Sequence, residues 1–247
     1  MRITQKITIL LLATVSLLAA CAGKPNPEQQ SIAAASTPVF NGDSAFQFVQ
    51  RQVDFGPRVP GTAQHTACAA FLDTTLRRFG AQVTIQNGEA TLYDGRIMHF
   101  KNIIASYNPQ ASKRLLLCAH WDTRPYADQD KNPANHHKPI LGANDAASGV
   151  GVLLEVARQL HLNEPTIGVD IVLFDLEDWG TPEFYTGPQR EDTWCLGSQY
   201  WAQQAVKNGY KAEFGILLDM VGAPNAQFYK EQISTYYASF AVEKVGN

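Results

Sequence analysis

Residues 169–178 read VDIVLFDLED, a largely apolar run that ends in a group of acidic side chains. Such a run predicts a strand that is buried on both faces of a sheet. Residues 114–119 have the same character, and residues 214–221 predict a third buried strand. Apolar side chains recur at helical spacing in residues 145–160 and 196–206. Strands and helices therefore alternate, which predicts an α/β fold with a mostly parallel sheet covered by helices.

The chain before these strands predicts two helices and a set of shorter strands. One helix begins at Asp43 or Ser44 and stops near Gly56, and a second covers residues 61–79. Three strands are expected at residues 81–86, 90–93 and 97–107, with turns at Asn87-Gly88 and Asp94-Gly95. Two long loops, residues 121–144 and 179–194, interrupt the later pattern, and such loops usually carry function.

Composition narrows the class of protein. The 247 residues are 45% hydrophobic and 17% charged, which is ordinary for a globular protein and excludes a disordered or collagen-like chain. A formal charge of -3 gives no basic footprint for nucleic acid. Four cysteines in this length do not make a disulfide scaffold.

The N-terminal residues predict a targeting segment. Arg2 and Lys6 precede a short apolar stretch, which is typical of a secretory signal, and residues 18–21 read LAAC. This ending resembles the bacterial lipoprotein box, in which cleavage leaves Cys21 as the lipidated N-terminus; an ordinary signal with a chance cysteine is the alternative. We therefore expect a signal peptide (1–20), a lipidated Cys21 with a flexible tether (21–40) and a catalytic domain (41–247), held at the bacterial cell envelope on the periplasmic or outer-surface side.

Ionisable side chains follow each of the three buried strands. They are His120 and Asp122, then Glu177 and Asp178, then Asp219, and Asp145 opens the helix after the first long loop. Ligands of open α/β sheets bind at the carboxyl ends of the strands, so we expect one imidazole and five carboxylates to meet at one edge. So many acids repel one another unless a cation lies between them, and histidine with carboxylates suits zinc.

Each of these residues also has a simpler explanation when it is taken alone. An aspartate at a helix start is commonly an N-cap, and a single acid after a strand is commonly solvated. His136 and His137 lie in a polar loop and are expected to face solvent. The remaining histidines, His65, His99 and His161, are expected to be ordinary helix or strand residues.

Several ordered motifs together resemble one known family. They are FGPRVPGT (55–62), CAHWDTRP (118–125), GANDAASGVGVLLEVAR (142–158), VLFDLEDWG (172–180) and LLDMVGAPNAQF (217–228). The resemblance is to the zinc aminopeptidase-like fold of metallopeptidase family twenty-eight, and within it to glutaminyl cyclases of the bacterial lipoprotein type. It implies a three-layer sandwich with a mixed, mostly parallel central sheet covered by helices.

The resemblance also implies roles for individual residues. Asp145 and Asp178 would be zinc ligands, Glu177 the general acid/base, and Asp219 a carboxylate that relays protons or holds the substrate amine. In the aminopeptidase relatives, His120 and Asp219 bind a second zinc that Asp145 bridges, whereas the cyclases use one zinc. In this chain His120 and Asp122 would belong to such a second site or lie just behind the ligands. The side chains of Trp121 and Trp194 would wall the substrate pocket.

The activity implied is cyclisation of an N-terminal glutamine to pyroglutamate with release of ammonia. The substrate would be a peptide or protein with that residue first, and the enzyme is expected to be a lipid-anchored monomer. One alternative is a two-zinc aminopeptidase, and another is an inactive surface lipoprotein that binds peptides or glycans. The Glu-Asp pair at residues 177 and 178, rather than Glu-Glu, favours the cyclase.

One feature departs from the family pattern. The family places a further zinc-binding histidine near its C-terminus, yet no histidine follows His161 in this sequence. The sequence therefore looks truncated at its C-terminal end, within an expected helix from Gln232 onward. A chain of these 247 residues is expected to have little or no activity.

Overall fold

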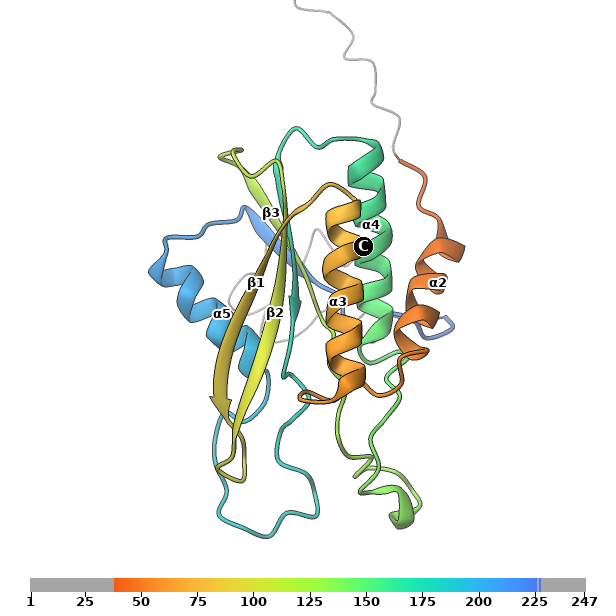
Figure 1. Ribbon diagram of the computed structural model, residues 1–247, viewed down its shortest axis with the longest axis vertical. Coiled ribbons are helices and arrows are strands. Elements are labelled where there is room, and N and C mark those ends of the chain that lie inside the picture. Colours follow the sequence, from red (N-terminus) through yellow and green to blue (C-terminus); the bar gives the residue numbers. More distant parts are fainter. Residues whose placement is uncertain (1–37, 226, 228–247) are drawn as a thin grey trace, which may run out of the picture. The chain divides into compact units, whose positions relative to one another are not determined.

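Five strands form one mixed sheet in the computed structural model, which describes residues 38–225 and 227 (Figure 1). The strands are β1 (Gln82–Thr91), β2 (Ile97–Tyr107), β3 (Arg114–His120), β4 (Gly168–Phe174) and β5 (Phe214–Leu217), in the order β1-β2-β4-β3-β5. The first pairings, β1 with β2 and β2 with β4, are antiparallel. The later strands are parallel, because β3 pairs in that sense with both β4 and β5. The alternation in the second half of the chain is thus confirmed.

Helices cover both faces of this sheet. One face carries α2 (Gly42–Val53), α3 (Ala63–Arg78) and α4 (Ala147–Leu162), and the other carries α5 (Leu196–Lys207) (Figure 1). A short 3₁₀ helix, η2 (Pro133–Asn135), lies within the first long loop. The predicted three-layer α/β sandwich is therefore confirmed.

Side-chain caps explain where the first two helices begin. The side chain of Asn41 accepts a hydrogen bond from the amide of Ser44, so the N-cap of α2 lies two residues before Asp43 and three before Ser44, the two caps predicted from the sequence. The side chain of Thr62 accepts from the amide of His65 at the start of α3. Each cap satisfies a backbone donor that the first turn of a helix leaves free.

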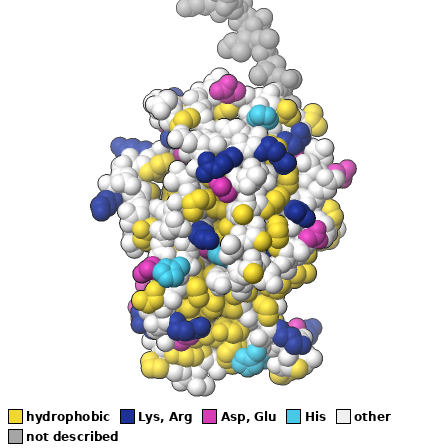
Figure 2. Space-filling model, viewed as in Figure 1, with side chains coloured by type: hydrophobic (Ala, Val, Ile, Leu, Met, Phe, Trp, Pro, Cys, Tyr) yellow, Lys and Arg dark blue, Asp and Glu magenta, His cyan; other side chains and the backbone are white. Residues whose placement is uncertain are grey.

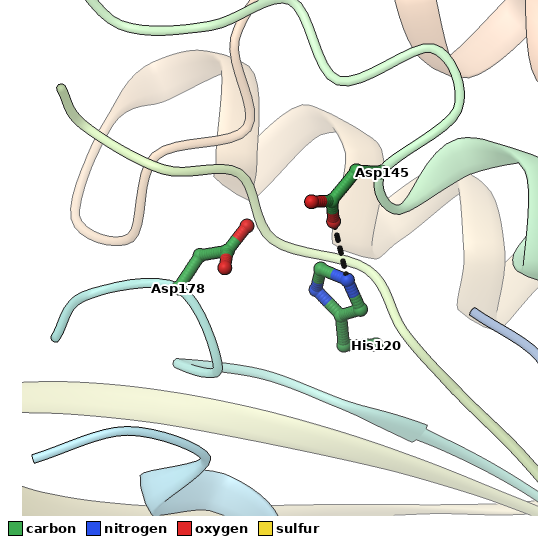
Figure 3. Close-up of side chains that lie close together, drawn as sticks. All are labelled: His120, Asp145 and Asp178. Atoms are coloured by element: carbon green, nitrogen blue, oxygen red, sulfur yellow. Dashed lines mark ion pairs between the residues drawn. The ribbon is translucent and has the colours of Figure 1, made fainter. Parts of the chain in front are cut away.

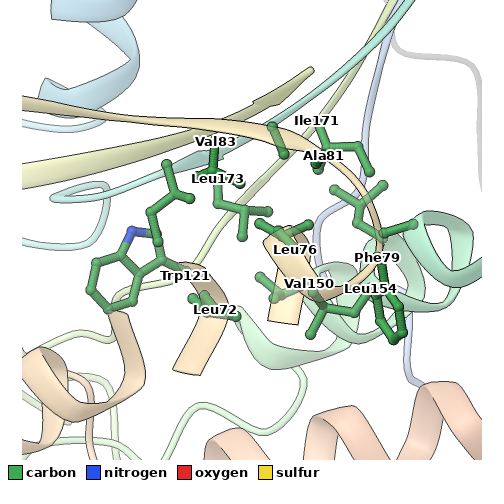
Figure 4. Close-up of a cluster of buried hydrophobic side chains, with 14 of the residues drawn as sticks. Leu72, Leu76, Phe79, Ala81, Val83, Trp121, Val150, Leu154, Ile171 and Leu173 are labelled. Carbon is green, nitrogen blue, oxygen red and sulfur yellow. The ribbon is translucent and has the colours of Figure 1, made fainter. Parts of the chain in front are cut away.

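The main core lies between the sheet and the layer of α3 and α4. Leu72 and Leu76 of α3 meet Val150 and Leu154 of α4 there, beneath strand residues such as Ile171 (Figure 4). All five side chains are fully buried. Burial of each such side chain stabilises the fold by about 1.5–3 kcal/mol relative to an exposed one. This core holds β3 and β4 rigidly, and these strands end at the candidate site.

The turn predicted at Asn87-Gly88 is wrong. These residues lie inside β1, where Asn87 pairs with Lys101 and Gly88 pairs with Phe100. A side chain at Gly88 would overlap the ring of Phe100, so this glycine makes room for a cross-strand ring and does not turn the chain. The turn at Asp94-Gly95 is confirmed, since the amide of Leu92 bonds across it to the carbonyl of Arg96.

The third predicted buried strand is also shorter and more exposed than expected. It ends at Leu217, whose side chain is 61% exposed, and it occupies an edge of the described sheet. No described strand pairs with its outer side, which explains the exposure. The expected helix from Gln232, the signal segment and Cys21 lie outside the described residues.

Charged side chains of both signs are spread over one face of the molecule (Figure 2). Lys and Arg side chains lie among acidic ones over the face in Figure 2 and do not gather into a single patch. Within residues 38–225 and 227, no helix is both long and apolar enough to cross a membrane.

Candidate active site

The ionisable side chains predicted at the strand ends do meet at one edge of the sheet. His120 ends β3, Glu177 and Asp178 follow β4, and Asp219 follows β5. Two groups of three potential ligands form there, and within each group the ligand atoms lie within 4.8 Å of one another. One group is His120, Asp145 and Asp178 (Figure 3), and the other is His120, Glu177 and Asp219.

His120 is the centre of this cluster. Its Nε2 atom lies 2.7 Å from Asp145 Oδ1, the ion pair drawn in Figure 3, and 3.6 Å from Asp219 Oδ1. Its Nδ1 atom lies 3.3 Å from Asp122 Oδ1 on the opposite side of the ring. The side chain is 2% exposed, and its contacts with carboxylates at both ring nitrogens fix its orientation.

Asp122 lies behind the cluster and belongs to neither ligand group. It is fully buried, and its two oxygens accept the amides of Glu177 at 3.1 Å and Asp178 at 3.2 Å. One carboxylate therefore orients the imidazole and also holds the backbone of the acid pair. This placement fits the role of a partner behind the ligands, the second of the two roles that the sequence left open for Asp122.

The start of α4 holds the segment that carries Asp219. The hydroxyl of Ser148 accepts the amide of Val221 at 3.0 Å, and the side chain of Asn144 accepts the amide of Gly222 at 2.8 Å. Gly149 brings the helix against the backbone of Leu218, where a Cβ atom would overlap the carbonyl oxygen. Because Gly149 has no side chain, the loop that carries Asp219 can approach α4 closely, and Asp219 thereby reaches the cluster.

A buried arginine holds the loop before Asp145. Arg58 is fully buried, and its Nη1 and Nη2 donate to the carbonyls of Leu141 at 2.6 Å and Gly142 at 2.7 Å. Its own carbonyl accepts the amide of Thr123 from the start of the same loop. Arg58 lies in the motif at residues 55–62, but no role for it could be predicted from the sequence. The one feature that could have indicated a role is that Arg58 is a charged residue within a segment rich in glycine and proline.

Burial and mutual repulsion shift the protonation of the cluster. Burial raises the pKa of Glu177 to about 7, and it raises the pKa of Asp178 to about 7 as well. Burial alone would lower the pKa of His120, but hydrogen bonds to its carboxylate neighbours raise it well above the usual range. The hydrogen bond from His120 in turn lowers the pKa of Asp219. Several carboxylates therefore interact with the single positive charge of the His120 imidazole.

This donor set fits a divalent cation. Asp178 Oδ2 is buried and has no hydrogen-bond partner among the described residues, and leaving such an atom unpaired costs about 1–3 kcal/mol. An imidazole and two carboxylates form a ligand set typical of zinc, which takes three protein ligands and keeps one position open in catalytic sites. His120, Asp145 and Asp178 are the side chains that would hold the ion.

The two tryptophans predicted to wall the pocket lie in different surroundings. Trp121 is fully buried in the main core, where it stacks on His65, so its expected role as a pocket wall is wrong. Its Nε1 atom donates to the carbonyl of Lys101 in β2 at 3.2 Å. Trp194 is 43% exposed, and its ring lies 4.5 Å from the guanidinium carbon of Arg124. The same guanidinium donates to the carbonyl of Asp178, so a pocket-wall role for Trp194 stays a prediction.

His65 has a specific buried partner, unlike the ordinary helix or strand residue that was expected. His65 is buried and bonds to Asp175, a residue three positions before Asp178, and no local pattern in the sequence indicated this pair. His136 and His137 lie in the first long loop, where His136 bonds to the carbonyl of Asp130. The described cysteines, Cys68, Cys118 and Cys195, are all free thiols.

Comparison with known proteins assigns the family. The model of peptidase family M28 matches residues 102–245, which is more than half of the chain. The chain belongs to this family. The match begins in β2 and includes the strand ends that carry the cluster, so the M28 assignment rests on the part of the fold just described.

Among solved M28-like structures, the glutaminyl cyclase of Tannerella forsythia is 55% identical, with a TM-score of 0.80 over 84% of this chain and 71% of that chain. A Zn-dependent exopeptidase from Parabacteroides distasonis is 54% identical, with a TM-score of 0.81 over 83% of this chain and 70% of the other. The glutaminyl-peptide cyclotransferase of Drosophila melanogaster is 26% identical over 192 residues, 73% of this chain. The chain spans about half the length of such curated relatives, 49% in this case.

Proposed function

We propose that this protein is a glutaminyl-peptide cyclotransferase, which converts an N-terminal glutamine to pyroglutamate and releases ammonia. The observation that carries the proposal is the meeting of Glu177, His120, Asp145 and Asp178 at one sheet edge. The chain around this edge is 55% identical to a protein described as a glutaminyl cyclase. A curated relative with the same activity in its name supports the same conclusion.

In the proposed reaction, the α-amine nitrogen of glutamine attacks its own side-chain amide carbon. A C–N bond forms in the new ring, the bond to the amide nitrogen breaks, and ammonia leaves. Glu177 takes the proton that the amine loses and delivers a proton to the departing nitrogen. Its half-buried carboxyl lies in the His120 group with Asp219, which would hold the amine by a hydrogen bond. Positioned acid/base groups of this kind contribute about 10²–10⁴-fold to rate.

We propose zinc as the resident ion, one per chain, with His120, Asp145 and Asp178 as its ligands among the described residues. When bound, zinc would supply Lewis-acid polarisation of the amide carbonyl. The chain's own contribution is to fix the ligand atoms: Asp122 orients His120, and the loop held by Arg58 presents Asp145. Trp194 would provide an apolar wall for the glutamine side chain.

A second candidate, a two-zinc aminopeptidase, has one observation in its favour. The cluster contains two ligand groups, and a similar solved structure is described as a Zn-dependent exopeptidase. In that reaction Glu177 would act as the base for a water that hydrolyses the first peptide bond. Both candidates use the same edge, so substrate specificity and metal content have to separate them.

The decisive experiment uses the purified protein in a form that includes the C-terminal histidine expected of the family, loaded with zinc. It is incubated with a glutaminyl peptide and with a leucyl peptide of otherwise identical sequence. Cyclisation gives ammonia and a pyroglutamyl product from the first peptide alone, whereas an aminopeptidase releases free leucine from the second. Glu177→Gln should reduce turnover about 10²–10⁴-fold and keep zinc, while Asp178→Ala should lose zinc as well. Glu164→Gln, an exposed change beyond α4, is the matched control. Equal zinc loss in the Glu177 and Asp178 variants would contradict the division of roles.

We also propose that the protein is lipid-anchored in the bacterial cell envelope. The sequence LAAC at residues 18–21 supports this, because lipid on Cys21 and acyl chains together give stable membrane attachment. Cys21→Ser should move the protein from the membrane fraction to the soluble fraction after cell lysis. Sedimentation of the variant with membranes would refute the anchor.

A further inference from the structure

A buried histidine–aspartate pair lies directly behind the acid pair of the site. The Nε2 atom of His65 in α3 is 2.9 Å from Asp175 Oδ1 and 3.0 Å from Asp175 Oδ2. The side chain of His65 is 3% exposed and that of Asp175 is fully buried. Neither residue belongs to the two ligand groups, and the proposed reaction does not use either of them.

Asp175 opens the turn that leads to Glu177 and Asp178. Its Oδ1 atom accepts the amide of Leu176 at 2.8 Å, and its Oδ2 atom accepts the amide of Lys101 in β2 at 2.7 Å. The carboxylate therefore ties the end of β4 to the neighbouring strand. It also fixes the first peptide unit of the turn.

The turn needs this support because its central residue has an unfavourable conformation. Leu176 has φ of +55° and is fully buried. A residue with a Cβ atom is strained in this left-handed region, and such residues persist only where their surroundings hold them. At the far end of the turn, Asp122 accepts the amides of Glu177 and Asp178. Two buried carboxylates, Asp175 and Asp122, thus hold the turn at its two ends.

His65 is itself held by the residue that follows the central histidine of the cluster. The rings of His65 and Trp121 stack with their centroids 4.2 Å apart and their planes at 19°. Trp121 Nε1 donates to the carbonyl of Lys101, the residue whose amide Asp175 accepts. The imidazole is thereby clamped between an indole and a carboxylate, with Nε2 directed at Asp175.

We propose that His65 is a positioning residue for the active site. It donates its Nε2 proton to Asp175 and so holds the Leu176 turn in the conformation that directs Glu177 and Asp178 toward His120. His65 touches neither substrate nor metal, and it acts only through the backbone of this turn. The consequence for turnover rests on the proposed function, whereas the consequence for the turn and for metal affinity does not.

Two substitutions separate the hydrogen bond from the ring. His65→Phe keeps a flat ring that can stack on Trp121 but removes the donor, whereas His65→Gln keeps an N–H donor and removes the ring. In the full chain we expect His65→Phe to speed hydrogen exchange of the amides of Leu176, Glu177 and Asp178. We also expect it to weaken zinc binding about 10–100-fold, the usual effect of losing a partner behind the ligands. His65→Gln should lie closer to wild type in both measurements.

Leu76→Val is the matched control, because Leu76 is fully buried on the same helix and is not part of the turn. It should reduce the free energy of unfolding without a selective increase in exchange at the turn. Wild-type exchange and zinc affinity in His65→Phe would overturn the proposal. Equal loosening of the turn by Leu76→Val would overturn it too, because His65 would then contribute packing alone. Ammonia release bears on the proposed function alone, whereas the exchange and zinc measurements decide the role of His65 whether or not the protein turns over a glutaminyl peptide.

Discussion

Asp122→Asn tests how the backbone of the acid pair is held. The wild-type carboxylate interacts with three donors: the amides of Glu177 and Asp178, and the Nδ1 atom of His120. The contact with His120 is buried, the two contacts with the amides are partly buried, and Asp122 itself is fully buried. Asparagine has nearly the same shape, but only one of its two terminal atoms can accept a hydrogen bond, and the other is a donor.

The expected loss in the free energy of unfolding follows from the number of donors that lose their acceptor. Whichever way the amide is turned, its NH₂ group faces at least one backbone N–H, which then has no acceptor. A buried donor without a partner costs about 1–3 kcal/mol, and exchanging a charged acceptor for a neutral one at the remaining bonds costs roughly 1 kcal/mol more. We expect the free energy of unfolding to fall by about 2–4 kcal/mol. Zinc affinity should fall about 10–100-fold, because His120 and Asp178 lose their common partner.

Urea unfolding and zinc titration against a competing chelator measure these two quantities. Asp170→Asn is the control: Asp170 is a buried carboxylate in β4 that accepts from Arg114 and Tyr210, and it belongs to neither ligand group. This variant should lose stability and keep its zinc affinity. Wild-type zinc affinity in Asp122→Asn would refute the reasoning. Complete loss of zinc would refute it as well, because Asp122 would then be a ligand.

Three further variants test neighbouring features. Arg58→Met removes two charge-assisted bonds to the loop before Asp145 and should lower both zinc affinity and the free energy of unfolding, the latter by about 2–4 kcal/mol; unchanged urea curves would contradict this. Burial alone would raise the pKa of Glu155, but hydrogen bonds from Arg158 and other neighbours lower it to about 2. The stability that this depressed pKa contributes is therefore present above pH ~4.3 and lost as the pH falls toward 2. Urea unfolding at several pH values should show that Glu155→Gln loses about 3 kcal/mol less unfolding free energy over this pH range than the wild type. Gly149→Ala should destabilise by about 1–3 kcal/mol through overlap with Leu218, and a gain in stability from better helix propensity would contradict the close approach.

The convergence of the cluster could be predicted because it depends on topology. His120, Glu177 and Asp219 follow parallel strands, and parallel strands end at one edge whatever the details of packing. The partners behind the cluster could not be predicted in this way. His65 and Asp175 are 110 positions apart, and a histidine near a helix start has no local feature that identifies its partner.

Local signals failed where tertiary packing decided the outcome. Asn87-Gly88 is a strong turn signal when it is taken alone, but β1 continues through it because the missing side chain of Gly88 accommodates Phe100. Trp121 failed for a related reason. Its position beside His120 indicated a pocket, yet side chains alternate between the faces of a strand, so neighbours along the chain point to opposite sides. The indole therefore belongs to the core and the imidazole to the site.

The geometry of His120 bears on the number of ions that the described residues can hold together. Both ligand groups include this histidine, but its Nε2 atom has one lone pair and its Nδ1 atom already faces Asp122. Nε2 lies closer to Asp145 than to Asp219, at 2.7 Å against 3.6 Å, which places the imidazole with Asp145 and Asp178. Glu177 and Asp219 then remain as carboxylates without an imidazole of their own, and a second ion there would need another donor or a carboxylate shared with the first ion. Both proposed reactions require a free Glu177 as acid or base, so the measured metal content of the protein has to decide between one ion and two.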